Sequence, residues 1–223
     1  MPTDVLTHTS RCSQCQSYRV RLLLITAWLS VLVGCGTLMP EPVLIREPRP
    51  HQIPLVVGVY YPEAFRELTY KPPPPPFFSD SVSIGDASVR LFDEALTLLF
   101  KQVVLLPGPL SPGVSPPNVA AVIEPSISTV NLWHPPLGQL PSSGPLSIRT
   151  IVAYAFTLST PEGERLATWN VAGEGVHIFG VETWNTAVKD SFERAMREAA
   201  WILVSGFRDV PDVARWLDLH GAK

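Results

Sequence analysis

Two glutamates, Glu124 and Glu174, are the acidic residues embedded in apolar, strand-like stretches of this chain. Burial raises the pKa of a carboxyl group, so that it stays protonated near neutral pH. A protonated carboxyl group paired with an ionised one, at a separation below about 10 Å, is the acid–base pair of glycoside hydrolysis. Glu124 precedes Pro125, however, and Glu174 lies between Gly173 and Gly175, positions that usually point to solvent. We therefore favour structural roles for both, and keep weak cell-wall hydrolysis as the least favoured function.

Other catalytic and metal-binding patterns are absent from the sequence. The chain has no HExxH, no GxSxG, no phosphate-binding P-loop and no GxGxxG after a strand. Of the five histidines, His134 and His177 lie in the body of the chain, and they lack metal-ligand spacing. Cys12 and Cys15 form a single CxxC, with no second pair to complete a zinc site. The sequence predicts no catalytic residue, no metal site and no cofactor.

Modification of Cys35 is the chemistry that the sequence favours. Arg19 and Arg21 precede a mostly apolar run, Leu22–Gly34, which ends at this cysteine. Basic residues, 7–15 apolar residues and a small-residue cleavage site form a secretory signal peptide, whereas a membrane-spanning helix needs about 20 apolar residues. A buried core helix and an uncleaved anchor are the alternatives. Cleavage before Cys35 would leave it as the only cysteine, without an intramolecular disulfide partner.

The elements downstream must hold the fold together by their apolar faces. Residues 36–53 are proline-rich and predict an extended tether, which at about 3 Å per residue would reach roughly 50 Å. We expect four parts: a signal peptide (1–34), the modified cysteine and tether (35–53), an α+β domain (54–207), and a short terminal helix or tail (208–223). Five consecutive prolines, Pro72–Pro76, fit a rigid loop better than a ligand for an aromatic groove.

Apolar periodicity predicts the secondary structure of the domain. The predicted strands are Leu55–Tyr61, Val119–Ile123, Ile127–Leu132, Ile148–Leu158 and Leu166–Gly173, and the predicted helices are Asp86–Val103, Thr186–Ser205 and Pro211–Leu219. A short extended piece is expected at Phe65–Tyr70. The fold class is α+β, a largely antiparallel sheet of about four strands with two helices packed on one face, preceded by the signal peptide and the Pro-rich tether. Pro125 is suited to an edge or a bulge, so Val119–Leu132 is expected to offer a free strand edge.

Two tryptophans, Trp133 and Trp184, fall in expected loops flanked by polar residues or proline. Exposed loop tryptophans are typical of binding surfaces. They would equally cap the ends of the sheet. Both interpretations stay open, and we treat the pair as a possible binding surface.

Leu32, Val33 and Gly34, followed by Cys35, resemble the lipobox of bacterial lipoproteins. The segments VVGVYYPEAFRELTY, IGDASVRLFDEALTLLF, AAVIEPSIS and TLSTPEGERLATWNVAGEG resemble, in their order, poorly characterised Gram-negative envelope lipoproteins of the YajG type over residues 54–207. The resemblance implies that Cys35 is acylated and holds the protein to a lipid bilayer, facing the periplasm. Gly36 and Thr37 follow the cysteine where no aspartate signals inner-membrane retention, which implies the outer membrane.

These observations favour a non-enzymatic accessory or scaffold protein of the envelope that binds a protein partner. A formal net charge of −3 with no basic stripe argues against nucleic-acid binding. The alternative is a carrier of a small ligand or lipid, which requires a wide apolar cleft between helices and sheet.

Overall fold

A computed structural model describes residues 37–42, 51–72, 81–110, 118–134, 147–178 and 183–221. They belong to one compact unit, Thr37–Lys223. The expected lipobox residues Leu32, Val33 and Gly34, the cysteine Cys35 and prolines 73–76 lie outside the described residues.

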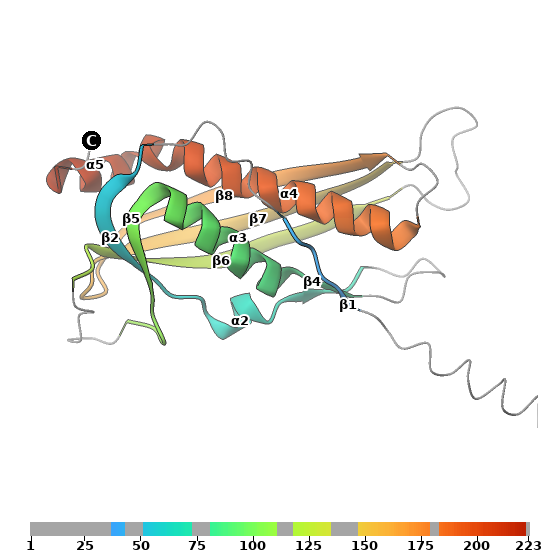
Figure 1. Cartoon of the computed structure of the whole chain (residues 1–223), viewed down its shortest axis with the longest axis horizontal. Helices are drawn as coiled ribbons and strands as arrows, with labels where there is room; N and C mark the ends of the chain where they lie inside the picture. Colours follow the sequence, from blue (N-terminus) through green and yellow to red (C-terminus); the bar gives the residue numbers. More distant parts are fainter. Residues whose placement is uncertain are drawn as a thin grey trace, which may run out of the picture. The chain divides into compact units, whose positions relative to one another are not determined.

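Five strands form the main sheet, in the spatial order β5-β2-β6-β7-β8. They are β2 (Ile53–Val59), β5 (Phe100–Leu105), β6 (Ala121–Trp133), β7 (Ser147–Ser159) and β8 (Arg165–Ile178). β2 pairs in parallel with both β5 and β6, whereas β6, β7 and β8 pair antiparallel. The three long antiparallel strands extend well beyond the parallel part (Figure 1).

A second, small sheet has the order β1-β4-β3. Its strands are β1 (Thr37–Leu38), β3 (Thr69–Tyr70) and β4 (Ser81–Ser83). β1 runs parallel to β4, and β3 runs antiparallel to it. Val82, at the centre of β4, is fully buried.

Helices cover one face of the main sheet. The described helices are α2 (Glu63–Arg66), α3 (Ile84–Leu99), α4 (Trp184–Gly206) and α5 (Pro211–Leu219), with one 3₁₀ turn, Phe207–Asp209. α3 and α4 lie on the same side of the sheet (Figure 1). The ring of Phe92 on α3 packs edge-on against those of Tyr154 and Phe156 on β7, at centroid distances of 4.7 and 5.1 Å. The core of the domain therefore lies between these helices and the sheet.

The expected fold class is wrong in its topology. The sheet is mixed, with five strands, a second small sheet accompanies it, and the described residues include four helices instead of two packed on a four-stranded, largely antiparallel sheet. The error arises at Phe100, where the helix ends and β5 begins: its φ of −114° and ψ of 151° are extended. Phe100 and Val103 happen to continue the helical spacing of Leu96 and Leu99, so local periodicity hid the strand. Parallel pairing with β2 joins residues far apart in the sequence and leaves no turn signal.

Several other expectations are confirmed. β7 alternates as predicted, with Ile148, Thr150, Val152, Tyr154, Phe156 and Leu158 all buried. α5 has the predicted bounds. The turn before β8 includes Gly163 at φ +93°, a conformation that favours glycine. Phe65, in contrast, lies in α2 and not in an extended piece.

β6 is one continuous strand that passes through Pro125. β2 pairs with it over Ala121–Ile123 only, and the last hydrogen bond joins the Tyr60 amide to the Ile123 carbonyl at 3.0 Å. The expected free edge is therefore wrong for these three residues. From Glu124 onward, no strand in the described part of the chain pairs with that side of β6, which is where a proline without an N–H is tolerated.

Part of the segment expected as a tether contacts the domain. Thr37 and Leu38 form β1 against Ser81 and Val82. The Pro40 carbonyl accepts a hydrogen bond from Arg90 on α3 at 3.2 Å, and the Glu41 amide donates one to Glu193 on α4 at 2.8 Å. Within the described ranges, no helix is both long and apolar enough to span a membrane.

Candidate functional site

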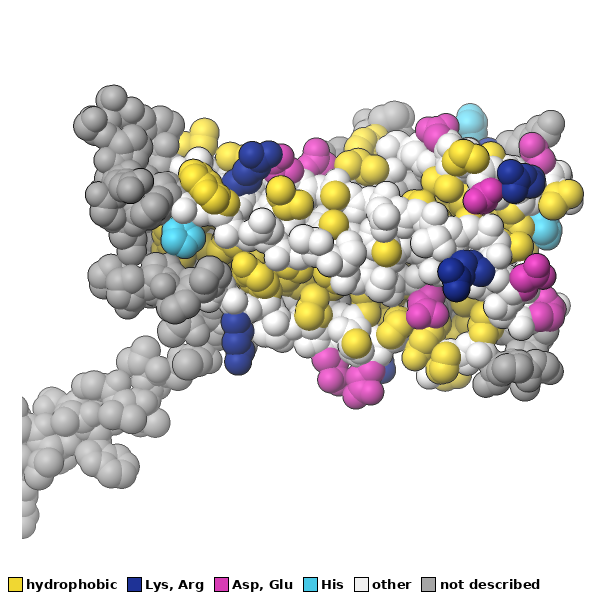
Figure 2. Space-filling model, turned by 180° about the vertical axis from the view of Figure 1, so that it is seen from behind, with side chains coloured by type: hydrophobic (Ala, Val, Ile, Leu, Met, Phe, Trp, Pro, Cys, Tyr) yellow, Lys and Arg dark blue, Asp and Glu magenta, His cyan; other side chains and the backbone are white. Residues whose placement is uncertain are grey.

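The face of the main sheet opposite α3 and α4 is the candidate site, and we call it the open face (Figure 2). Register places its residues in rows across the three long strands. Trp133, Arg149 and Val176 form one row, and the next is Asn131, Ile151 and Glu174. Further rows carry small and uncharged side chains: Thr129 with Ala153 and Ala172, then Ser126 with Ala155 and Asn170.

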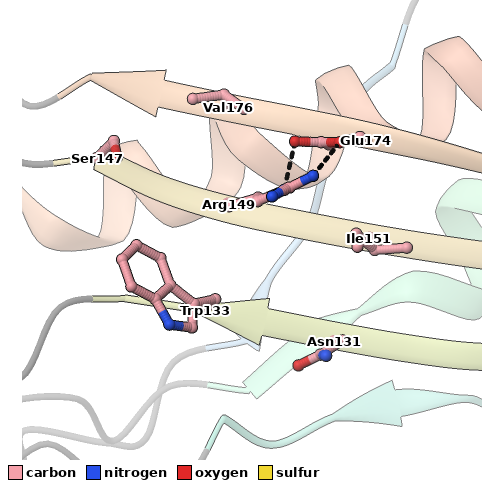
Figure 3. Close-up of a pocket in the computed structure, with 7 residues that line it drawn as sticks. All are labelled: Asn131, Trp133, Ser147, Arg149, Ile151, Glu174 and Val176. Carbon is pink, nitrogen blue, oxygen red and sulfur yellow. Dashed lines mark hydrogen bonds and ion pairs between the residues drawn. The ribbon is translucent and has the colours of Figure 1, made fainter.

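A shallow hollow of about 560 Å³ occupies the first two rows of the open face. Figure 3 shows its lining from all three long strands, and we call it the hollow. Its lining residues are Asn131, Trp133, Ser147, Arg149, Ile151, Glu174 and Val176.

Arg149 and Glu174 form a two-pronged ion pair across the hollow (Figure 3). The Arg149 Nη2 donates to Glu174 Oε2 at 2.7 Å, and the Arg149 Nε contacts the other carboxylate oxygen. The two side chains are 53% and 38% exposed, so solvent screens the pair and its contribution to stability is small. Its effect is to fix the direction of both side chains beside Trp133.

The end of the open face at the hollow exposes large apolar side chains. Trp133 is 56% exposed, Val176 44% and Ile178 60%. Isolated exposed apolar residues are ordinary, but an aromatic and two β-branched residues at one end of a sheet are typical of an interaction surface.

The structure separates the two tryptophans that the sequence singled out. Trp133 lies on the open face at the end of β6, whereas Trp184 begins α4 and is partly buried against the core. The ring of His134 lies edge-on to that of Trp184, with centroids 5.3 Å apart. Trp133 is therefore the one of the pair that contacts the hollow.

Glu124 and Glu174 both point to the open face but do not form a pair. Glu124 lies in the row of Thr157 and Thr168, whereas Glu174 lies in the row of Asn131. Strand rise and spacing put the two carboxylates roughly 20 Å apart, well beyond the distance that glycoside hydrolysis requires. Partial burial raises the pKa of Glu124, but Glu174 is committed to Arg149.

His134 and His177 have different surroundings. His177 lies at the end of β8, where its Nδ1 is 2.5 Å from Asp190 on α4, on the helical side of the sheet. Among the described residues, no group of three or more His, Cys, Asp and Glu side chains is placed to hold a metal ion.

Sequence reasoning missed Arg149 and Val176 as members of the site. No local pattern marks either residue, because the neighbours of a side chain across the strands depend on register. The hollow exists because β6, β7 and β8 align Trp133, Arg149 and Val176 in one row.

No protein-family model and no curated protein sequence matches the chain. Solved structures do resemble it. A protein of Helicobacter pylori described as a neuraminyllactose-binding hemagglutinin homologue has a TM-score of 0.50 at 8% identity, over 82% of this chain and 100% of that one. At this identity the likeness is one of fold alone.

Two further structures are similar with lower scores. A protein of Xanthomonas campestris assigned to the family DUF330 has a TM-score of 0.48 at 12% identity, over 78% of this chain and 98% of that one. A minor lipoprotein of Acinetobacter baumannii has a TM-score of 0.42 at 11% identity, over 74% and 96%. Structures described as bacterial lipoproteins are thus among those that resemble this chain, and the likeness is one of fold alone.

Proposed function

We propose that this chain is a bacterial envelope lipoprotein, anchored through acylated Cys35, that binds a protein partner on its open face and has no catalytic role of its own. The role is that of an accessory or scaffold protein in assembly or maintenance of the envelope. The outer membrane is the proposed location, because no aspartate follows the cysteine at Gly36 or Thr37.

The anchor is supported by the order of residues before Cys35 and by the lipoproteins among the structural neighbours. Several acyl chains on one cysteine, at about 0.8 kcal/mol per buried methylene, hold a protein at a membrane durably. A protein anchored in this way meets only partners that come close to the membrane surface.

The single observation that carries partner binding is the open face, which the described helices leave uncovered, with Trp133 at one end. The described helices cover the other face, and among the described residues a long antiparallel surface of small side chains lies beside an exposed tryptophan. Tryptophan and arginine are the residue types enriched where binding energy concentrates in protein interfaces. The Arg149–Glu174 pair presents polar groups of fixed direction beside that tryptophan.

A carrier function is less favoured by the packing. A carrier needs a cleft between helices and sheet, but the described side chains there fill the space. Phe92, Tyr154, Phe156 and Phe192 are fully buried, and the rings of Phe92, Tyr154 and Phe156 contact one another.

The test is site-specific photo-crosslinking in living cells. A photoreactive residue replaces Asn131 in the hollow, and a control replaces Ile202, which is 39% exposed on α4 on the helical side. We expect a discrete protein adduct from position 131 that is absent from position 202 and weakened by Trp133→Ala. Intact mass of the same protein measures acylation at Cys35, with Cys35→Ala as control, and separation of the two membranes measures location.

The outcomes separate the parts of the proposal. Lipid-only adducts at position 131, or equal adducts at both positions, would overturn partner binding by the open face. An uncleaved or unacylated product would overturn the anchor.

A further inference from the structure

The lipid-bearing end of the mature chain is separated from a hydrogen-bonded strand by a single residue. β1 begins at Thr37, only two residues after Cys35. Because consecutive Cα atoms are about 3.8 Å apart, the Cα atom of Cys35 lies within about 8 Å of that of Thr37 in any conformation. This contrasts with the roughly 50 Å reach of an extended tether of eighteen residues.

The first residues of the domain are held by more than one contact. Leu38 pairs with the buried Val82 and packs against the core. The next residues cross the helices, where Arg90 bonds the Pro40 carbonyl and Glu193 accepts from the Glu41 amide. These contacts lie on α3, α4 and β4 together, so β1 is fixed to the body of the domain.

β1 lies at the same end of the domain as the hollow. Val82 on β4 pairs with Tyr70 on β3, which places Leu38 and Tyr70 about two strand spacings, or roughly 10 Å, apart. The Tyr70 hydroxyl hydrogen-bonds the backbone of Leu132, the residue before Trp133. α5 and the turn before β8 lie at the opposite end (Figure 1).

Large apolar side chains are exposed preferentially at this anchored end. Four of the seven that the described residues expose are here: Met39, Trp133, Val176 and Ile178. Met39 is 46% exposed and directly follows β1.

We propose that the domain rests directly on the membrane through the end formed by β1, β3, β4 and the C-terminal end of β6, with the lipid surface as the occupant of that end. This rests on the proposed acylation of Cys35. Acyl chains in the bilayer hold Thr37 close to the lipid headgroups. Because β1 is paired with β4, this end of the domain is held close to the headgroups as well. Met39 and Ile178, which are exposed there and do not line the hollow, gain from burial among headgroups and acyl chains. The hollow then opens beside the bilayer, so its partner is a component that reaches the membrane surface.

The test is fluorescence quenching with the full-length, natively acylated protein in vesicles of phosphatidylethanolamine and phosphatidylglycerol. The vesicles carry a lipid spin-labelled at its headgroup. Single cysteines at Met39 or at Leu219, which is 80% exposed on α5, carry the fluorophore. Acylation blocks Cys35, and Cys12 and Cys15 leave with the signal peptide, so each label is unique.

We expect quenching at position 39 to exceed that at position 219 at least three-fold. A twenty-residue Gly/Ser insertion between Gly36 and Thr37 lengthens the connection between Cys35 and β1, and we expect it to remove this difference. The same insertion after Gly163, in the turn at the opposite end, leaves it intact and serves as the matched control.

Equal quenching at the two positions in acylated protein overturns the inference and leaves the anchor in place. A difference that survives the insertion before Thr37 overturns the part of the inference that assigns the contact to the short connection between Cys35 and β1. Intact mass without acyl groups overturns the proposed anchor itself, and with it this inference.

Discussion

Gly175 on β8 lies so close to Ser191 on α4 that a Cβ atom added to it would stand 1.8 Å from the Ser191 carbonyl oxygen. Two residues earlier, a Cβ on Gly173 would stand 2.0 Å from the Ala195 carbonyl. Helix α4 therefore packs against the backbone of β8 itself. Glu174, between the two glycines, points to the open face, so one strand segment serves both helix packing and the hollow.

Gly175→Ala is expected to lower the free energy of unfolding by about 3 kcal/mol, because α4 must move away from β8 to admit the methyl group. Gly206→Ala is the control: nothing lies within 4 Å of an added Cβ, and alanine raises helix propensity by up to about 1 kcal/mol. Urea unfolding of both, in a soluble Cys35→Ala background, measures the difference. Equal stability of the two variants would contradict the close packing.

Thr150 and Ser191 form a fully buried hydroxyl pair at 2.7 Å. Ser191 donates its proton to the Val188 carbonyl at 2.8 Å, so the Thr150 hydroxyl is the donor in the pair. Ser191→Ala leaves a buried donor unsatisfied and is expected to cost about 2 kcal/mol, and Thr150→Val about 1 kcal/mol.

The double variant of Thr150 and Ser191 should cost less than the sum of the single changes, because no buried hydroxyl is left unsatisfied. A double-mutant cycle by urea unfolding measures the coupling, expected at about 1 kcal/mol. Strict additivity would show that the two hydroxyls do not interact.

Asp190 on α4 contacts His177 on β8 and Arg194 one turn further along its own helix. Partial burial is the largest influence and raises its pKa, but hydrogen bonds from Arg194 and His177 outweigh burial and hold the pKa below its usual value. A depressed folded-state pKa contributes stability above the unfolded pKa of about 3.9, and that stability is lost as pH falls through the folded pKa. Asp190→Asn should therefore destabilise by about 1 kcal/mol at pH 7 and by less at pH 2.

The measurement is the free energy of unfolding of wild type and Asp190→Asn at both pH values. Asp212→Asn, which removes an exposed pair with Arg215, is the matched control and should have little effect at either. A difference for Asp190→Asn that is constant from pH 7 to pH 2 would contradict the role of its charge.

Trp133 and Trp169 should differ in what their removal costs. Trp133 is 56% exposed, so Trp133→Ala should change the free energy of unfolding by about 0.5 kcal/mol or less. Trp169 is buried and stacked on Phe156 at 5.5 Å, so Trp169→Ala should cost about 3–5 kcal/mol. Thermal unfolding compares them, and a strongly destabilising Trp133→Ala would assign that tryptophan to the core instead of the hollow.

The element that sequence periodicity predicted best is β7, and the one it missed is β5. In β7 the alternation of Ile148, Val152, Tyr154 and their neighbours directly reflects one buried face. In β5 the spacing of Phe100 and Val103 fits a helix, and the order apolar, polar, polar, apolar over these four residues lacks the alternation of a strand. Only pairing with β2, more than forty residues earlier, decides between the two.

The candidate site was predictable in part. Trp133 could be named from its place beside proline and polar residues, but its separation from Trp184 could not. Glu124 and Glu174 were correctly favoured for solvent-facing positions. Their distance from one another depends on the register of β6, β7 and β8, which no local pattern encodes.

The sequence by itself determined the alternation of β7, the bounds of α5 and the apolar stripe of α4, because each depends on side chains that are neighbours in one element. The order of residues before Cys35 is also local, and the anchor that it predicts stays a prediction. Tertiary structure alone decided the parallel core of the sheet, the rows of the open face and the attachment of Thr37–Glu41 to the domain. Each of these depends on contacts between residues far apart in the chain. Such contacts contribute to stability only after folding has brought the partners together, so no local pattern records them.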